Sequence, residues 1–160
     1  MSKVLVAYFS ATGTTGVVAT KLAESINADC YEIVPAEPYT NADLDWRDEN
    51  SRSSIEMKKE PHSRPAIGSV PIENMDEYDT IFVGYPVWWY LCPKLINTFL
   101  ESYNLSGKTI VLFATSGGSG FGKSVESLED SAPGARIVEG AILNGVKSEA
   151  DLKRFAEKYI

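Results

Sequence analysis

Five short runs of apolar residues alternate along this chain with segments whose apolar side chains recur at helical spacing. The runs cover residues 4–9, 30–34, 80–84, 109–114 and 137–143. Continuous apolar runs of this length indicate strands that are buried on both faces. Strands that alternate with helices favour a parallel sheet covered by helices on both faces and joined by right-handed crossovers. We therefore predict an α/β fold with a doubly wound, five-stranded parallel sheet.

The intervening helices are also visible in the sequence. They are expected from Gly16, after Pro93, over residues 121–128 and after Ser148. Pro93 suits the first position of its helix, and Ser148 with Asp151 resembles a capping box. In the last apolar run, Glu139 and Gly140 interrupt the pattern as they would in an edge strand.

Residues 35–76 depart from this alternation. The segment contains five of the eight prolines and many charged residues, and it is too long for an ordinary connection. We expect one domain over residues 1–160, in which residues 35–76 form an inserted excursion over the surface. Short helices are expected within it at residues 43–49 and 53–59.

Two placements of this excursion have different consequences. If it folds over the ends of the strands, then Trp46, Arg47 and His62 can wall a binding site. If it packs on an edge of the sheet, the same side chains are structural.

Composition limits the class of protein and of partner. The 160 residues fit a single core, and the formal net charge of −7 without a basic stripe argues against binding to nucleic acid or to an anionic membrane. An acidic surface suits a basic protein partner, although it also serves ordinary solubility. Cys30 and Cys92 are far apart, so neither a zinc site nor a disulfide framework is indicated. With no targeting segment or long apolar run, we expect a soluble, cytoplasmic protein.

A turn rich in hydroxyl groups lies between the first strand and the first helix. Ser10, Thr12, Thr14 and Thr15 surround it, and the backbone N–H groups of a helix start favour a bound phosphate. No Lys or Arg lies between residues 4 and 20, and neither the nucleoside triphosphate loop nor the dinucleotide fingerprint follows this strand. A helix cap without a ligand is the alternative.

Aromatic residues follow the third strand. The loop reads Pro86, Val87, Trp88, Trp89, Tyr90. Ligands of doubly wound sheets bind at the carboxyl ends of the strands, where these rings can form a flat apolar wall. The alternative is that the two Trp residues anchor core helices, but adjacent side chains point in different directions and cannot all be buried together.

The fourth strand ends in a glycine-rich loop. Ser116, Gly117 and Gly118 begin it, and such a backbone can approach a ligand closely and offer N–H donors. Residues 117–124 also match the spacing of a nucleoside triphosphate loop. We attribute this match to chance, because no strand ends in an acidic residue that could hold magnesium with Ser124.

The first of these loops resembles the phosphate loop of the flavodoxins. Their pattern Ser/Thr-x-Thr-Gly-x-Thr is matched at Ser10, Thr12, Gly13 and Thr15, and the other two loops fall where flavodoxin-like proteins bind the flavin ring. The strand order 2-1-3-4-5 is that of flavodoxin itself and is taken over from the resemblance. The Pro-x-Trp-Trp loop is similar to that of a bacterial branch of small flavodoxin-like proteins.

The resemblance implies FMN as cofactor, with no metal and no catalytic side chain. The implied phosphate contacts are Ser10, Thr12, Gly13, Thr14 and Thr15, and the implied ring contacts are Pro86, Val87, Trp88, Trp89, Tyr90, Ser116, Gly117 and Gly118. Cys92 could be a reactive thiol and His62 a proton donor, but packing and solvation respectively are the more ordinary roles.

Three functions are compatible with this resemblance. The first is an electron-transfer carrier that works with a redox partner protein, which the acidic chain and the absence of a second nucleotide fingerprint favour. The second is an NAD(P)H-dependent FMN reductase that acts on quinones or nitroaromatics, which a homodimer would favour over a monomer. The third is a nucleotide-binding module without redox chemistry. The sequence therefore leaves open whether the protein is an enzyme.

Overall fold

A five-stranded parallel sheet forms the centre of the molecule. The computed structural model describes residues 3–11, 13–60, 62–88, 91–115, 120–144 and 148–160. The strands are β1 (Lys3–Tyr8), β2 (Asp29–Glu32), β3 (Tyr78–Pro86), β4 (Thr109–Thr115) and β5 (Arg136–Ile142). Their order is β2-β1-β3-β4-β5, and every neighbouring pair is parallel. The predicted fold class and strand order are confirmed.

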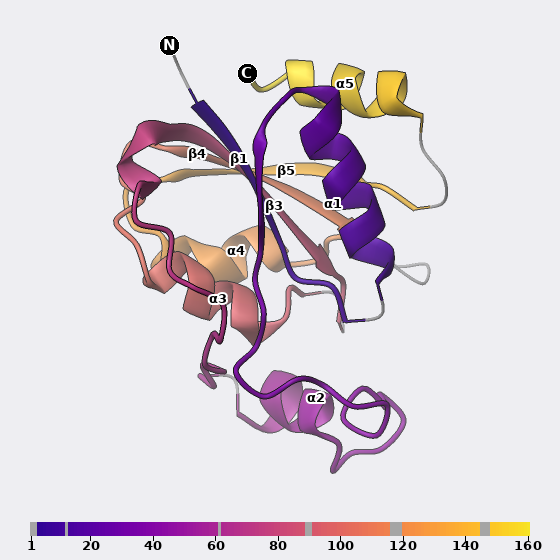
Figure 1. Ribbon diagram of the computed structural model, residues 1–160. Helices are drawn as coiled ribbons and strands as arrows, with labels where there is room; N and C mark the ends of the chain where they lie inside the picture. The colour runs from indigo at the N-terminus through magenta and orange to yellow at the C-terminus, as the bar shows by residue number, and fades with distance from the viewer. Residues whose placement is uncertain (1–2, 12, 61, 89–90, 116–119, 145–147) are drawn as a thin grey trace.

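Helices cover both faces of the sheet (Figure 1). The helices α1 (Thr14–Ser25) and α5 (Glu149–Glu157) pack on one face, and α3 (Lys94–Glu101), α4 (Ser124–Leu128) and the 3₁₀ turn Glu129–Ser131 pack on the other. Alternate residues of each strand point to opposite faces. Phe82 and Val111 accordingly lie in the core under α1 and α5, whereas Ile81 and Leu112 lie in the core under α3 and α4.

The interruption in the last apolar run is a β-bulge. Leu112 pairs with Glu139, but Phe113 pairs with Ala141, so Gly140 has no partner on β4. A Cβ atom at position 140 would collide with the carbonyl oxygen of Leu112. Glycine is therefore required where the edge strand bends toward its neighbour.

Three helices begin at residues other than the predicted ones, and one of them is α4, which begins at Ser124 and not at residue 121. Helix α1 already begins at Thr14, so Gly16 lies within its first turn. Pro93 lies just before α3 with extended backbone (ψ 147°), and the first helical residue is Lys94. The Ser148 cap is confirmed, because its hydroxyl accepts a hydrogen bond from the N–H of Asp151 at 3.1 Å.

The helix predicted at residues 43–49 is wrong. This stretch consists of turns, because short polar side chains bind nearby N–H groups and so compete with a helix. Asp43 and Thr40 cap each other's N–H groups, and the Asp45 carboxylate accepts from the N–H of Arg47. The second predicted helix is present as α2 (Arg52–Ser54), which continues into a π-helical turn at Ile55–Lys59.

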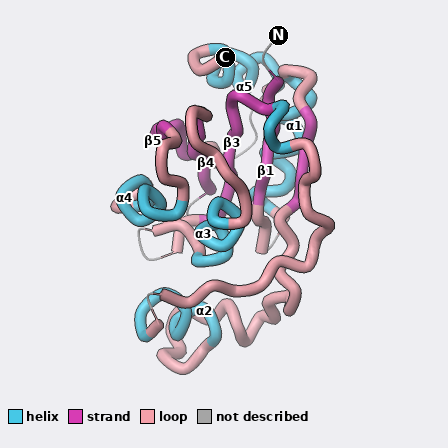
Figure 2. The backbone as a smooth tube through the Cα atoms, turned by 90° about the vertical axis from the view of Figure 1, so that its left-hand side faces the viewer, coloured by secondary structure: helices cyan, strands magenta, loops and turns pink. Residues whose placement is uncertain are grey.

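Residues 36–66 of the inserted segment lie beyond the carboxyl ends of the strands (Figures 1 and 2), whereas its last residues run along the edge strand β2, where Ser69 and Val70 bond to Tyr31. The two ends of residues 36–66 meet at a neck, where the N–H of Ala36 donates to Ala66 and the N–H of Gly68 donates to Val34. The chain then returns past β2 through the 3₁₀ turn Met75–Glu77 into β3. No helix among the described residues is long and apolar enough to span a membrane.

Candidate functional site

The strands β1, β3 and β4 end side by side at the carboxyl edge of the sheet, where the three candidate loops begin. The loops that follow β1 and β3 flank the adjacent ends of these strands, and the N–H of Phe9 donates to the carbonyl of Gly84 at 2.9 Å. The N–H of Val87 donates to the carbonyl of Thr115 at 2.9 Å, which joins the end of β3 to the end of β4. Candidate ligand-binding segments that are distant in sequence are thus brought together.

The turn after β1 is built around the side chain of Ser10. Its Oγ accepts hydrogen bonds from the N–H groups of Gly13 and Gly16, each at 3.0 Å. Gly13 has a left-handed backbone with φ 93°, and no atom would approach a Cβ there within 4 Å. Two amide donors at a helix start already converge on one oxygen, so this donor set fits an anionic oxygen such as that of a phosphate.

Thr15 has a connecting role that the sequence did not reveal. Its side chain is buried, and its Oγ1 lies 2.8 Å from Oγ1 of Thr115 at the end of β4. This bond ties the turn after β1 to the start of the glycine-rich loop. The hydroxyl of Thr115, at the end of a mainly apolar strand, was a local signal for it. Thr14 is exposed, and direct phosphate contacts by Thr14 and Thr15 stay predictions.

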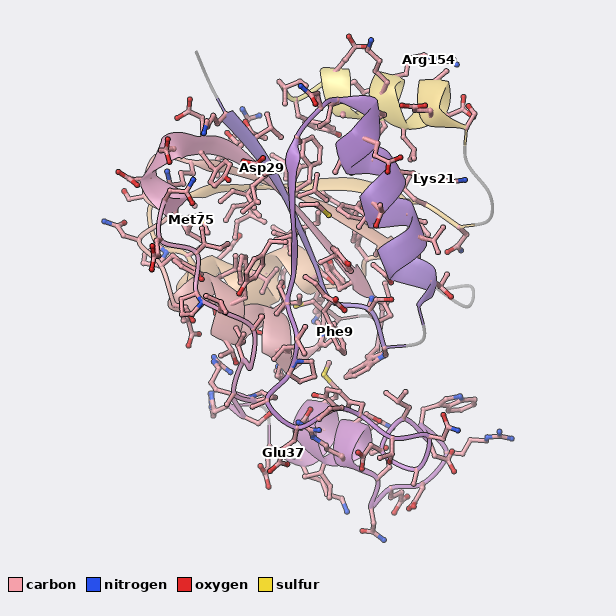
Figure 3. The ribbon with its side chains drawn as sticks, in the orientation of Figure 1. Phe9, Lys21, Asp29, Glu37, Met75 and Arg154 are labelled. Atoms are coloured by element: carbon pink, nitrogen blue, oxygen red, sulfur yellow. The ribbon has the colours of Figure 1, made fainter. Side chains whose placement is uncertain are left out.

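The aromatic loop after β3 is held rigidly at Trp88. Trp88 and Leu91 exchange backbone hydrogen bonds of 2.9 and 3.0 Å. The Trp88 ring packs edge-on against Phe9 at 5.8 Å and against Tyr39 at 5.4 Å between centroids. Figure 3 shows Phe9 at the edge of the sheet that faces the inserted segment. Phe9 ends the first apolar run, whereas nothing in the sequence pointed to Tyr39.

A polar clasp fixes Tyr39 within the inserted segment. Its hydroxyl donates to Oε1 of Glu56 at 2.5 Å, and Arg52 donates from Nε to Oε2 of the same carboxylate at 2.9 Å. The Arg52 guanidinium also lies 3.9 Å from the centroid of the Tyr39 ring. Burial, together with the Glu56 carboxylate, raises the pKa of the Tyr39 hydroxyl far above its ordinary value, so this group remains a neutral donor.

A pocket of about 200 Å³ lies between the inserted segment and the aromatic loop. Its lining residues are Leu44, Trp46, Ser53, Val87 and Trp88. Trp46 lines this pocket, which agrees with the placement of the excursion over the strand ends. Arg47 and His62 are exposed and do not belong to the described lining.

Residues 3–159 match the model of a family described as flavodoxin. The chain belongs to the flavodoxin family. None of the curated proteins matches the sequence.

Solved structures resemble this flavodoxin-family protein over almost its whole length. A provisionally assigned flavoprotein from Bacteroides eggerthii has 49% identity and a TM-score of 0.89, with 99% of this chain and 98% of that chain covered. A similarly assigned flavoprotein from Bacteroides uniformis has 47% identity and a TM-score of 0.89, with 98% of each chain covered. A Lactobacillus acidophilus flavoprotein in complex with FMN has 22% identity and a TM-score of 0.72, with 98% and 99% covered, and shares the fold.

The remaining candidate residues of this flavodoxin-family protein fall into two groups. Pro86 and Val87 are half-buried at the end of β3. Thr12, Trp89, Tyr90, Ser116, Gly117 and Gly118 lie outside the described residues, and their contacts stay predictions.

The geometry argues against two alternatives, a nucleoside triphosphate loop that ends at Ser124 and a reactive thiol at Cys92. Ser124 is fully buried and donates its hydroxyl to the carbonyl of Phe121 at 2.8 Å, so it does not offer a magnesium ligand as a triphosphate loop requires. Burial raises the pKa of the Cys92 thiol to about 11, so this side chain is a protonated packing residue at neutral pH.

Proposed function

We propose that this protein binds FMN and works as an electron-transfer carrier. The observation that carries the proposal is that the N–H groups of Gly13 and Gly16 converge on the Ser10 hydroxyl. Thr115 bonds both to Thr15 in this turn and to Val87 in the loop after β3, so it holds the two loops together. One end of this edge suits a terminal phosphate and the other a flat ring. Membership of the flavodoxin family and the fold shared with an FMN complex support the choice of cofactor.

The chain's own residues have separable roles toward this cofactor. FMN supplies the redox chemistry when bound, and the protein supplies position and environment. Ser10 and Gly13 present the phosphate-binding turn, and Thr15 holds this turn against β4. Trp88 and Val87 provide apolar surface beside the ring, and apolar surroundings disfavour charge on the reduced cofactor.

The charge of the chain favours a protein partner in this role. The formal net charge of −7 attracts a basic redox protein and accelerates its encounter, particularly at low salt. In the inserted segment, Asp45 and Asp48 are exposed close to the exposed ring of Trp46. We place the carrier in the cytoplasm, where the unpaired thiols of Cys30 and Cys92 stay reduced.

The pocket between the inserted segment and Trp88 favours a second candidate. An NAD(P)H-dependent FMN reductase needs space for a small acceptor such as a quinone or a nitroaromatic compound. The pocket has aromatic and aliphatic walls of that kind. Such a reductase commonly completes its site in a homodimer, so a monomeric protein would favour the carrier.

Anaerobic reduction of the FMN-loaded protein separates the two candidates. NADH and then NADPH are added while the flavin absorbance is followed over seconds, with free FMN at equal concentration as control. A carrier stays yellow until a separate reductase is added, and then passes its electrons to a basic redox protein. Rapid bleaching by either nucleotide alone would contradict the carrier and support the reductase. Gel filtration of the same sample gives the oligomeric state.

A further inference from the structure

The walls of the pocket come from two regions that are far apart in sequence. Leu44, Trp46 and Ser53 belong to the inserted segment, and Val87 and Trp88 belong to the loop after β3. No described residue of the turn after β1 lines it, so the pocket lies apart from the phosphate-binding end of the site. Trp88 contacts Phe9 and Tyr39, which fixes the orientation of the wall.

A buried hydroxyl on this wall lacks a partner in the protein. Ser53 is 1% exposed, and its Oγ has no hydrogen-bond partner among the described residues. A buried polar group without a partner costs about 1–3 kcal/mol. The neighbouring Ser54 is also buried, but its hydroxyl accepts from Ser51 at 2.9 Å. The unsatisfied group thus belongs to the residue that lines the pocket, which points to a ligand that supplies the missing partner.

Size and charge restrict this ligand. The five lining side chains carry no ionised group, so these walls offer no charged partner to an ionised ligand. An apolar cavity of about 150 Å³ can hold benzene, so about 200 Å³ accommodates a small substituted ring but not a nicotinamide dinucleotide. Between Trp46 and Trp88, a flat aromatic molecule would gain the most contact.

We propose that this pocket binds a neutral, flat, conjugated ring molecule with a hydrogen-bond-accepting oxygen at its edge, to which the Ser53 hydroxyl donates. A quinone carbonyl has this chemistry, and so does a nitro group. The proposal rests on the second candidate function and adds the residue that orients its electron acceptor. When bound and reduced, FMN would supply the two electrons and two protons that convert a quinone into its hydroquinone.

The test is equilibrium binding to the FMN-loaded protein. Duroquinone is the probe, because its four methyl groups occupy the ring positions at which the exposed thiol of Cys30 could otherwise add to a quinone. Equilibrium dialysis should show binding, and Ser53→Ala should raise the Kd about three- to tenfold, the effect of one hydrogen bond. Ser54→Ala is the matched control and should keep the Kd of the original protein. Leu44→Trp should abolish binding by filling the cavity. Parallel titrations with nitrobenzene distinguish the two classes of acceptor.

Two further measurements separate this pocket from the flavin site. The Kd for FMN should be the same in the Ser53→Ala protein and the original one. The rate at which duroquinone reoxidises the photoreduced protein should saturate with quinone concentration. An unchanged duroquinone Kd in Ser53→Ala, or competition between duroquinone and FMN, would overturn the pocket proposal and leave FMN binding intact. A protein that retains no flavin absorbance would refute the proposed function instead.

Discussion

The central sheet and the inserted segment are stabilised by different kinds of interaction. Fully buried apolar side chains, such as Phe82 on one face and Leu112 on the other, fill both faces of the sheet. In the segment, the buried residues between positions 37 and 60 are Ser51, Ser53, Ser54, Glu56 and Met57. Apolar burial is cooperative across a core, whereas hydrogen bonds at a surface open locally. The protein therefore combines a central sheet stabilised by apolar packing with an inserted segment that is held largely by its own hydrogen bonds.

The largest expected effect tests the central sheet in this comparison. Gly140→Ala places a Cβ against the backbone carbonyl of Leu112, which cannot move without breaking the pairing of β4 with β5. We expect the free energy of unfolding to fall by about 3 kcal/mol, as for overpacked cores. Urea denaturation measures it, and Gly120→Ala, where a Cβ meets nothing within 4 Å, is the control. Equal losses in both variants would contradict the bulge explanation.

A second prediction concerns the turn after β1, which is proposed to bind the FMN phosphate. Ser10→Ala removes the acceptor for the N–H groups of Gly13 and Gly16 and loosens this turn. The Kd for FMN should rise about tenfold, which corresponds to the loss of one to two hydrogen bonds. Flavin fluorescence quenching measures it. Ser25→Ala, at the far end of the same helix, should leave the Kd unchanged.

The clasp within the inserted segment gives the third prediction. Tyr39→Phe removes the hydrogen bond to the Glu56 carboxylate, which contributes about 1.5 kcal/mol. Because the segment opens locally, amide hydrogen exchange should accelerate roughly tenfold in residues 38–60 and not in β3 or β4. Tyr159→Phe, on the opposite face of the sheet, is the control. Faster exchange in the whole sheet would show that the two regions unfold as one unit.

The smallest expected effect concerns the ion pair between the segment and α3. Arg64 donates to both carboxylate oxygens of Glu101 at 3.0 Å, and this bond, with a second from Ser131, lowers the pKa of Glu101. A lowered folded-state pKa adds stability above the unfolded value of about 4.3, and the stability is lost as the pH falls through the folded value.

Glu101→Gln should accordingly destabilise the protein at pH 7 by only about 0.5 kcal/mol, because both side chains are more than a third exposed. The difference from the original protein should shrink once the pH falls below about 4.3 and vanish below the lowered folded-state pKa of Glu101. Urea unfolding at the two pH values measures it, with the exposed Glu126→Gln as control. A difference that persists at low pH would mean that the carboxylate charge is not its cause.

The sequence by itself determined the sheet, its flanking helices and the turn around Ser10. These features depend on local patterns: apolar runs, helical periodicity and a hydroxyl-rich helix start. The turns at residues 43–49 were mispredicted because Asp43 and Asp45 bind nearby N–H groups instead of continuing a helix.

Only the tertiary structure decided which distant residues meet. Thr15 bonds to Thr115 across 100 positions, and Tyr39 packs on Trp88 because the neck at residues 34–36 and 66–68 returns the segment over the strand ends. The pocket that contains Ser53 exists only because of this return. Such contacts depend on packing between elements, and no periodicity along the chain encodes them.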